Sequence, residues 1–217
     1  RDATTNEILI KKHLSENDLV LHTDMAGSPF VVIKANREDV KKMLSLSFTT
    51  NSIGEKYLLE AGSFTFINSK AWKSGIAQEK VFYVKPSQIS KTAQSGEYLT
   101  KGAFMIRGEK NYLSPQPDAG IGITTKTPDT TPLLVVGPTS ALEVYCDEII
   151  IFEQGNQKLS EVAFFIQKAF QKSHEVQFSI QEITHLLPNG IQIPKRRLRK
   201  DELKKKYVLQ LDAELEG

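Results

Sequence analysis

Residues 91–110 of this 217-residue chain hold a cluster of cations, namely Lys91, Lys101, Arg107 and Lys110. Only Glu97 and Glu109 oppose them in the same stretch. Cations at this density can follow a nucleic-acid backbone, where each phosphate contact releases counterions. A lysine beside a turn glycine such as Gly108 is equally typical of a plain solvated turn. The residues alone thus leave a phosphate-binding patch and a solvated turn as alternatives.

Two aromatic side chains near this patch could stack on nucleobases, Trp72 and Tyr98. Trp72 comes at the end of an apolar helical stretch, a position more typical of a core residue than of a stacking surface. The sequence therefore favours a buried Trp72.

His22 and Asp24 are the one pair that could perform acid–base chemistry, because they stand two residues apart on an expected strand. No nucleophile motif, phosphate-binding loop, C-x-x-C or H-E-x-x-H accompanies them. The four histidines lack the spacing of metal ligands. The sequence predicts no enzyme, no cofactor and no metal, and His22 is expected to be a packed or edge-facing side chain.

Cys146 is the single cysteine, so no disulfide within the chain is possible. It lies in an apolar run and is expected to be a small buried hydrophobic residue. No signal peptide is visible and no apolar run reaches the length of about 18 residues that spans a membrane. We expect a cytoplasmic location without a membrane partner, and the initial Arg1 suggests a piece of a longer protein.

The composition is that of a globular protein, with 40% hydrophobic and 25% charged residues and a formal net charge of +2. The charge is segregated. Residues 1–111 carry 16 Lys/Arg and 12 Asp/Glu, whereas residues 112–194 carry 4 and 9. Residues 195–217 carry 8 and 5, with all eight cations between Lys195 and Lys206. This pattern is compatible with a polyanionic partner at both ends of the chain, although a solvated surface with a charged tail would give the same net charge.

Hydrophobic periodicity predicts helices at residues 2–14, 38–46, 52–73, 158–172 and 179–187. Strands are predicted at residues 18–24, 30–34, 80–85, 103–107, 119–124, 133–136 and 141–152. The first helix is expected to begin with a capping box of Thr4 and Glu7, and Glu7 can pair with Lys11.

These elements follow no βαβ rhythm, so we predict an α+β fold, a mostly antiparallel twisted sheet with two or three packed helices. We expect a core over residues 1–123, an α+β extension over residues 124–194 packing on that core, and a basic tail over residues 195–217.

Three blocks of sequence carry a resemblance to a known family. The first is RDATTNEILIKK at residues 1–12, running into DLVLHTDMAGSP at residues 18–29. The second is SKAWKSG at residues 69–75, followed by VFYVKP at residues 81–86. The third is VKPSQISK at residues 84–91, SGEYL at residues 95–99 and GAFMIRGEKNY at residues 102–112. In this order they closely resemble the NFACT-R domain, the C-terminal RNA-binding module of the FbpA/NEMF/RqcH proteins, in an archaeal-type version. The resemblance covers about residues 1–123, and residues from about 124 onward match no motif of the family.

The resemblance implies a non-enzymatic role in ribosome-associated quality control. Full-length members bind the large ribosomal subunit with a stalled peptidyl-tRNA and recruit tRNA for template-independent C-terminal tailing. The implied partners are large-subunit ribosomal RNA, tRNA and the remainder of the parent NFACT protein, whose N-terminal domain and coiled coil have no counterpart here. The alternative from another class is a surface adhesin that binds fibronectin, because the family also carries that description.

The resemblance and the charge pattern together select a set of RNA-binding candidates: Arg1, Asp2, Asn6, Lys11, Lys12, Lys85, Lys91, Lys101, Arg107, Lys110 and Asn111. Asp2 and Asn6 have a second interpretation, since either could cap the first helix.

Overall fold

The computed structural model describes residues 3–25, 27–34, 38, 53–92 and 102–194. The chain divides into two compact units, Arg1–Pro117 and Asp118–Gly217. The expected boundary after residue 123 falls inside strand β7 (Gly120–Thr124), which pairs only with strands of the second unit. The expected tail over residues 195–217 lies outside the described residues. Both units combine helices with antiparallel strands, so the α+β prediction is confirmed.

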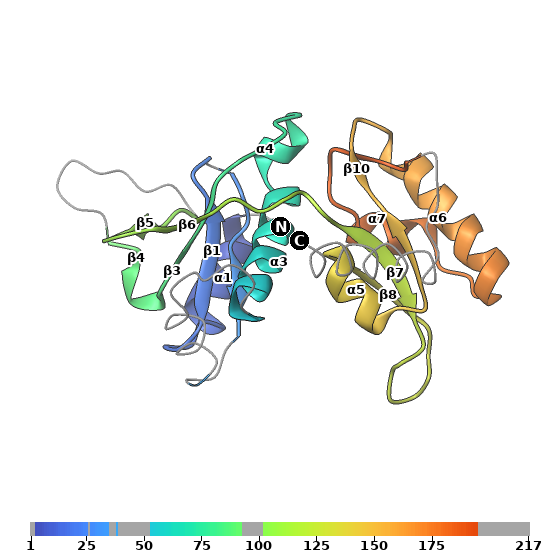
Figure 1. The fold of residues 1–217 in the computed structure, drawn as a ribbon, viewed down its shortest axis with the longest axis horizontal. Helices are drawn as coiled ribbons and strands as arrows, with labels where there is room; N and C mark the ends of the chain where they lie inside the picture. Colours follow the sequence, from blue (N-terminus) through green and yellow to red (C-terminus); the bar gives the residue numbers. More distant parts are fainter. Residues whose placement is uncertain (1–2, 26, 35–37, 39–52, 93–101, 195–217) are drawn as a thin grey trace, which may run out of the picture. The chain divides into compact units, whose positions relative to one another are not determined.

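The first unit is built on a four-stranded antiparallel sheet in the order β2-β1-β3-β6 (Figure 1). The strands are β1 (Leu19–Thr23), β2 (Val31–Ile33), β3 (Val81–Val84) and β6 (Asn111–Leu113). A separate hairpin pairs β4 (Ile89–Ser90) with β5 (Met105–Ile106), after the short 3₁₀ helix η1 (Pro86–Gln88). The predicted strands of this unit are confirmed, with shorter bounds.

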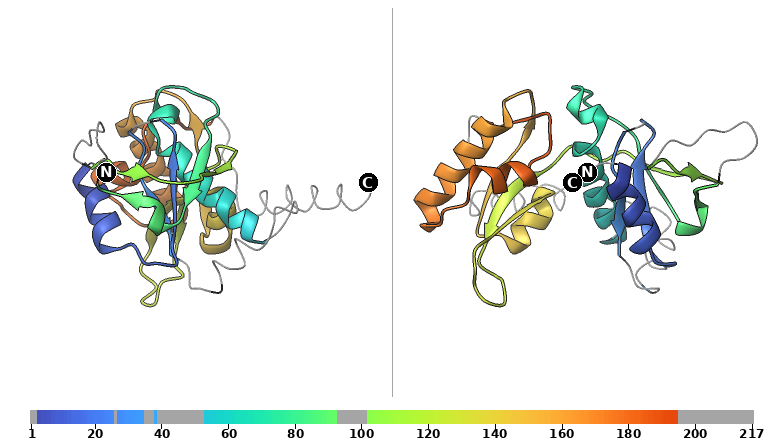
Figure 2. Two further views of the ribbon diagram at one scale, coloured as in Figure 1. Left: turned by 90° about the vertical axis from the view of Figure 1, so that its left-hand side faces the viewer. Right: turned by 180° about the vertical axis from the view of Figure 1, so that it is seen from behind.

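Different helices cover the two faces of this sheet because side chains alternate along each strand. Helix α1 (Ala3–Lys12) and the β4–β5 hairpin pack on the face that carries Val20, Phe82 and Val84. Helix α3 (Ile53–Ile67) packs on the face that carries Leu113. The left view in Figure 2 shows α1 and α3 on either side of the sheet. α1 thereby lies on the same face as the hairpin.

The helix predicted over residues 52–73 is two helices, α3 and α4 (Lys70–Lys73), because the Ser69 hydroxyl accepts a hydrogen bond from the Trp72 amide and begins a new helix. Trp72 is 4% exposed and its ring meets Phe66 edge-on, with 5.7 Å between ring centroids. The expectation of a core Trp72 is confirmed. The apolar spacing of residues 52–73 also predicts that Tyr57 faces inward, but Tyr57 is 51% exposed.

The start of α1 also differs from expectation. The helix includes Thr4, so Thr4 does not occupy the capping position, and the Glu7 carboxylate binds other groups described below. The predicted Glu7–Lys11 pair is present. The helix predicted over residues 38–46 lies outside the described residues, apart from Glu38.

The second unit contains a three-stranded antiparallel sheet in the order β8-β7-β9 and a small β10–β11 pair. The further strands are β8 (Leu133–Gly137), β9 (Glu148–Ile151), β10 (Glu153–Gln154) and β11 (Ile191–Gln192). The predicted helices are present as α6 (Leu159–His174) and α7 (Ile180–Leu186). Ser179 and Glu182 form a capping box at the start of α7. Figures 1 and 2 show α6 and α5 (Thr139–Tyr145) on opposite faces of the sheet.

Helix α5 contradicts the strand predicted over residues 141–152, of which only β9 forms. Leu142 and Cys146 lie one helical turn apart and both are buried against the sheet, whereas Val144 and Tyr145 are each 62% exposed. The helix approaches β7 at Gly122, where a Cβ atom would lie 2.4 Å from the Cys146 sulfur. Cys146 is buried as expected, at the end of a helix rather than in a strand.

None of the helices in the described part of the chain combines the length and apolarity that crossing a bilayer requires.

Candidate nucleic-acid interface

The Glu7 carboxylate joins α1 to the segment around the β4–β5 hairpin. Its Oε1 accepts a hydrogen bond from Lys91 Nζ at 2.8 Å and one from the Gly102 amide at 3.3 Å. Its Oε2 accepts from Lys11 Nζ at 3.3 Å. Two of the predicted RNA-binding cations are therefore held beside one acid. Each ammonium group has three N–H donors, so both lysines keep donors for a further anion.

The hydrogen bond from Lys91 is the main reason that the pKa of Glu7 falls from 4.5 to about 2. A carboxyl whose pKa is lowered by folding stabilises the folded state above its unfolded pKa, and this contribution disappears as the pH falls toward the folded value. The contacts of Glu7 are thus expected to persist at pH 4 and to weaken as the pH approaches 2.

We predict that the Glu7 carboxyl, followed by NMR in an acid titration, has its midpoint near pH 2. Lys91→Met is expected to move that midpoint up toward 4.5, because it removes the largest contribution. Lys11→Met is the matched control and should move it less. A midpoint near 4.5 in the unchanged chain would show that the Glu7–Lys91 contact does not persist in solution.

Arg107 lies on the turn between β5 and β6, and the Gln88 side chain fixes this turn. The Arg107 amide donates to the Gln88 carbonyl at 2.8 Å. Gln88 Nε2 donates to the carbonyl oxygens of Arg107 and Glu109, at 3.0 and 2.7 Å. Gly108 has a φ of +76°, which glycine adopts without strain. The Arg107 side chain reaches along the hairpin, where its Nη2 lies 3.5 Å from the carbonyl oxygen of Thr92, the residue after Lys91.

Lys110 forms a second cluster with residues of β1, β3 and β6. Its Nζ lies 2.7 Å from Asp24 Oδ1 and 4.3 Å from the centroid of the Phe82 ring. The Tyr112 hydroxyl donates to the same Asp24 oxygen at 3.3 Å. Partial burial opposes ionisation of Asp24, but the Lys110 ammonium holds the pKa of the carboxyl below its usual value. These two contacts therefore orient the Lys110 ammonium group at the surface.

The remaining candidates are spread over the first unit. Lys12 is exposed in the last turn of α1, and Asn6 is half-buried inside α1, so Asn6 does not cap the helix. Lys85 is exposed before η1, and Asn111 is exposed on β6, where its side-chain amide reaches the Tyr83 carbonyl at 3.5 Å. Arg1, Asp2, Lys101 and the aromatic candidate Tyr98 lie outside the described residues. A single continuous patch of Lys91, Lys101, Arg107 and Lys110 stays a prediction.

His22 and Asp24 have separate partners in the structure. The His22 ring nitrogens lie 2.6 Å from the Thr23 carbonyl oxygen and 2.9 Å from that of Ser28, and burial lowers the pKa of the imidazole. The ring packs against Phe30 with 4.6 Å between centroids. His22 is thus a packed residue, as expected, while Asp24 pairs with Lys110.

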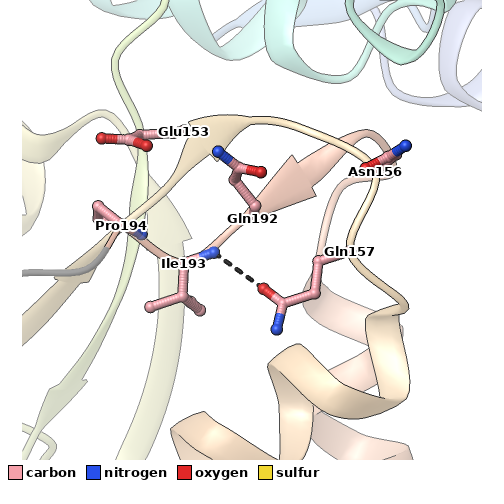
Figure 3. Close-up of a pocket in the computed structure, with 6 residues that line it drawn as sticks. All are labelled: Glu153, Asn156, Gln157, Gln192, Ile193 and Pro194. Carbon is pink, nitrogen blue, oxygen red and sulfur yellow. Dashed lines mark hydrogen bonds between the residues drawn. The ribbon is translucent and has the colours of Figure 1, made fainter.

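A polar pocket lies in the second unit, lined by Glu153, Asn156, Gln157, Gln192, Ile193 and Pro194 (Figure 3). Gln157 Oε1 accepts a hydrogen bond from the Ile193 amide at 3.2 Å. The lining residues include a carboxylate but no cation, so they do not form a phosphate site. Across the described ranges, no three His, Cys, Asp or Glu side chains gather in a way that could hold a metal ion.

The sequence did not indicate the contact of Glu7 with Lys91, although it predicted the pair of Glu7 with Lys11, and it did not indicate Tyr112 as an exposed aromatic residue. Tyr112 stands directly before the buried Leu113, and this alternation was the available signal that its ring lies on the opposite face of the sheet from Leu113.

Comparison with known proteins decides the family. Residues 1–108 match the family model described as the NFACT protein RNA binding domain. The chain belongs to the NFACT family. Glu7, Lys91 and Arg107 lie within the matched part, while Lys110 and Tyr112 come two and four residues after its end.

Two curated relatives are similar to this chain over the same region. The archaeal Rqc2 homolog aRqcH of Methanocaldococcus jannaschii is 34% identical over 191 residues, which is 88% of this chain and 26% of that protein. The human ribosome quality control complex subunit NEMF is 38% identical over 115 residues, 53% of this chain and 10% of that protein. The chain thus spans about a quarter of the first relative and a tenth of the second. Homologues of this NFACT chain are ribosome quality control factors.

One solved structure also matches, the C-terminal part of the fibronectin/fibrinogen-binding protein from Streptococcus suis. The TM-score is 0.37 at 20% identity, over 54% of this chain and 38% of that chain. A similarity of this size supports no conclusion about the ligand of the NFACT domain.

Proposed function

We propose that this chain is the RNA-binding part of a cytoplasmic ribosome quality-control factor. In the complete protein it would contact large-subunit ribosomal RNA and tRNA while a stalled peptidyl-tRNA occupies the subunit, and so support template-independent tailing of the nascent chain. The remainder of the NFACT protein, with its N-terminal domain and coiled coil, would supply the other steps. The match of residues 1–108 to an RNA-binding domain carries the proposal.

The distribution of charge supports an assignment of RNA contact to the first unit. Residues 1–117 carry 16 Lys/Arg and 12 Asp/Glu, whereas residues 118–194 carry 4 and 9. A polyanion is attracted by the first set and repelled by the second. Four cationic side chains of this unit are oriented by a neighbouring carboxylate or carbonyl oxygen and keep further N–H donors for a ligand: Lys11, Lys91, Arg107 and Lys110. We assign phosphate contacts to Lys91, Arg107 and Lys110 of this set and, from sequence alone, to Lys101.

The test is sedimentation of the complete parent protein in cell lysate on a sucrose gradient. We expect it in the large-subunit fraction, and we expect raised salt to release it because counterion release weakens phosphate contacts. A parent protein that stays at the top of the gradient would contradict the proposal. If that protein also bound immobilised fibronectin, the adhesin alternative would take its place.

A further inference from the structure

Tyr112 presents an aromatic ring at the open edge of the first unit's sheet. β6 is the outermost strand beside β3, and Tyr112 pairs in register with Phe82, which in turn pairs with His22. The three rings form a row on one sheet face, with centroid distances of 6.2 Å for Tyr112–Phe82 and 6.0 Å for Phe82–His22. Phe82 is buried, but Tyr112 is 48% exposed at the end of the row.

The exposed ring is held in one orientation from two sides. The Phe82 ring meets it edge-on at an interplanar angle of 73°. The Tyr112 hydroxyl is hydrogen-bonded to Asp24, which Lys110 holds in place. An aromatic ring fixed in this way loses little conformational entropy when a flat ligand packs on it. The arrangement therefore forms a preorganised stacking surface.

Cations flank the ring. Lys80 Nζ lies 5.8 Å from the centroid of the Tyr112 ring, and Lys110 lies over the neighbouring Phe82. Lys80 is exposed at the start of β3. Glu79 and Glu109 are next to Lys80 and Lys110 in the sequence, and Asp24 is paired with Lys110. A flat group stacked on Tyr112 with anionic groups beside it matches an aromatic ring that has one ammonium group over it and a second over the neighbouring Phe82 ring.

We propose that Tyr112 stacks on an unpaired nucleobase of single-stranded RNA, with Lys80 and Lys110 contacting the adjoining phosphates. Bases in a duplex are stacked on one another, so only an unpaired base offers its face to a side chain. The proposal rests on the RNA binding proposed above and names the kind of RNA that this edge of the sheet selects. It goes beyond the cation patch because Tyr112 would contact a nucleobase, whereas the cations would contact only the phosphates of the RNA backbone.

The test measures affinity by fluorescence anisotropy for a short mixed-sequence single-stranded RNA and for a blunt duplex of the same sequence. Tyr112→Ala is expected to weaken binding of the single strand about 5- to 150-fold, the range for loss of one base–aromatic stack, and to leave duplex binding at the wild-type level. Tyr112→Phe keeps the ring and should retain most of the affinity. Tyr112→Leu keeps apolar bulk against Phe82 without a ring, so it should bind RNA like Tyr112→Ala. As the folding control, the thermal unfolding midpoints of the variants should equal that of the unchanged chain.

Three outcomes would overturn the proposal, and they can be told apart. Equal binding of the single strand by Tyr112→Ala and the unchanged chain removes the stacking role and leaves the proposed function standing. If Tyr112→Ala loses the same affinity for the single strand and for the duplex, the change acts on the surface in general and not on stacking with an unpaired base. Failure of the unchanged chain to bind either RNA removes the proposed function together with the stacking site.

Discussion

Replacing Trp72 with alanine is expected to destabilise the first unit by about 3–5 kcal/mol, the range for truncation of a large aromatic residue in a core. Trp72 is 4% exposed and packs edge-on against Phe66, which is fully buried. Removal of the indole ring would lose this contact and leave a cavity between α3 and α4. The measurement is the free energy of unfolding from a urea titration followed by circular dichroism.

Two further variants make this result specific. Trp72→Phe keeps an aromatic ring opposite Phe66 and should lose less stability than Trp72→Ala. Tyr57→Ala removes an aromatic residue of α3 that is 51% exposed, so it should change stability by no more than about 0.5 kcal/mol. An unfolding midpoint of Trp72→Ala equal to that of the unchanged chain would show that the indole ring does not belong to the core.

RNA affinity is expected to fall steeply with salt, with a log–log slope of about −3 for four phosphate contacts to a single strand at about −0.7 each. The four contacts are those assigned to Lys91, Lys101, Arg107 and Lys110. Changing both Lys91 and Arg107 to glutamine should reduce the slope to about −1.5 and weaken binding about 25-fold at 0.1 M salt, because the loss per contact equals its counterion release. Glutamine is chosen because a glutamate at position 91 would repel Glu7.

The matched control carries the same change of charge in the second unit, Lys158→Gln with Lys172→Gln. Both lysines are exposed at the ends of α6, within the acidic half of the chain. This pair should leave the slope unchanged. Equal effects of the two pairs would mean that net charge alone governs binding, and a slope near zero for the unchanged chain would remove the phosphate patch altogether.

Local patterns were sufficient for the elements whose packing follows their periodicity. α6 buries Val162, Ala163, Ile166 and Phe170 at helical spacing, which the sequence displays directly. β1 and β3 were predicted from the alternation of side chains between turn residues, and both form, although nearly all of their side chains are buried. In these cases the local preference and the tertiary environment agree.

α5 shows why other elements could not be found in this way. Leu142, Val144, Tyr145 and Cys146 favour a strand by composition, but the surface next to them is the glycine-lined face of β7. That face accepts a close helix, which buries Leu142 and Cys146 and leaves Val144 exposed. The available local signal was Pro138 followed by Thr139 and Ser140, a combination common at helix starts.

In the candidate interface, too, some residues could be predicted from the sequence and others could not. Charge density indicated Lys91, Arg107 and Lys110 from sequence alone. Their partners could not be read from it, because Glu7 is 84 residues from Lys91 and Asp24 is 86 residues from Lys110. Only the pairing of strands and the placement of α1 bring these acids to the cations.

The close contact between α5 and β7 gives the chain a built-in chemical reporter. Cys146 is the single thiol, fully buried where Gly122 faces it, so a thiol-modifying reagent can reach the sulfur only when the second unit opens. Trp72 is the single tryptophan and lies in the first unit. Pulse labelling of the thiol and intrinsic tryptophan fluorescence would therefore follow the opening of the two units separately, in one sample of the unsubstituted chain.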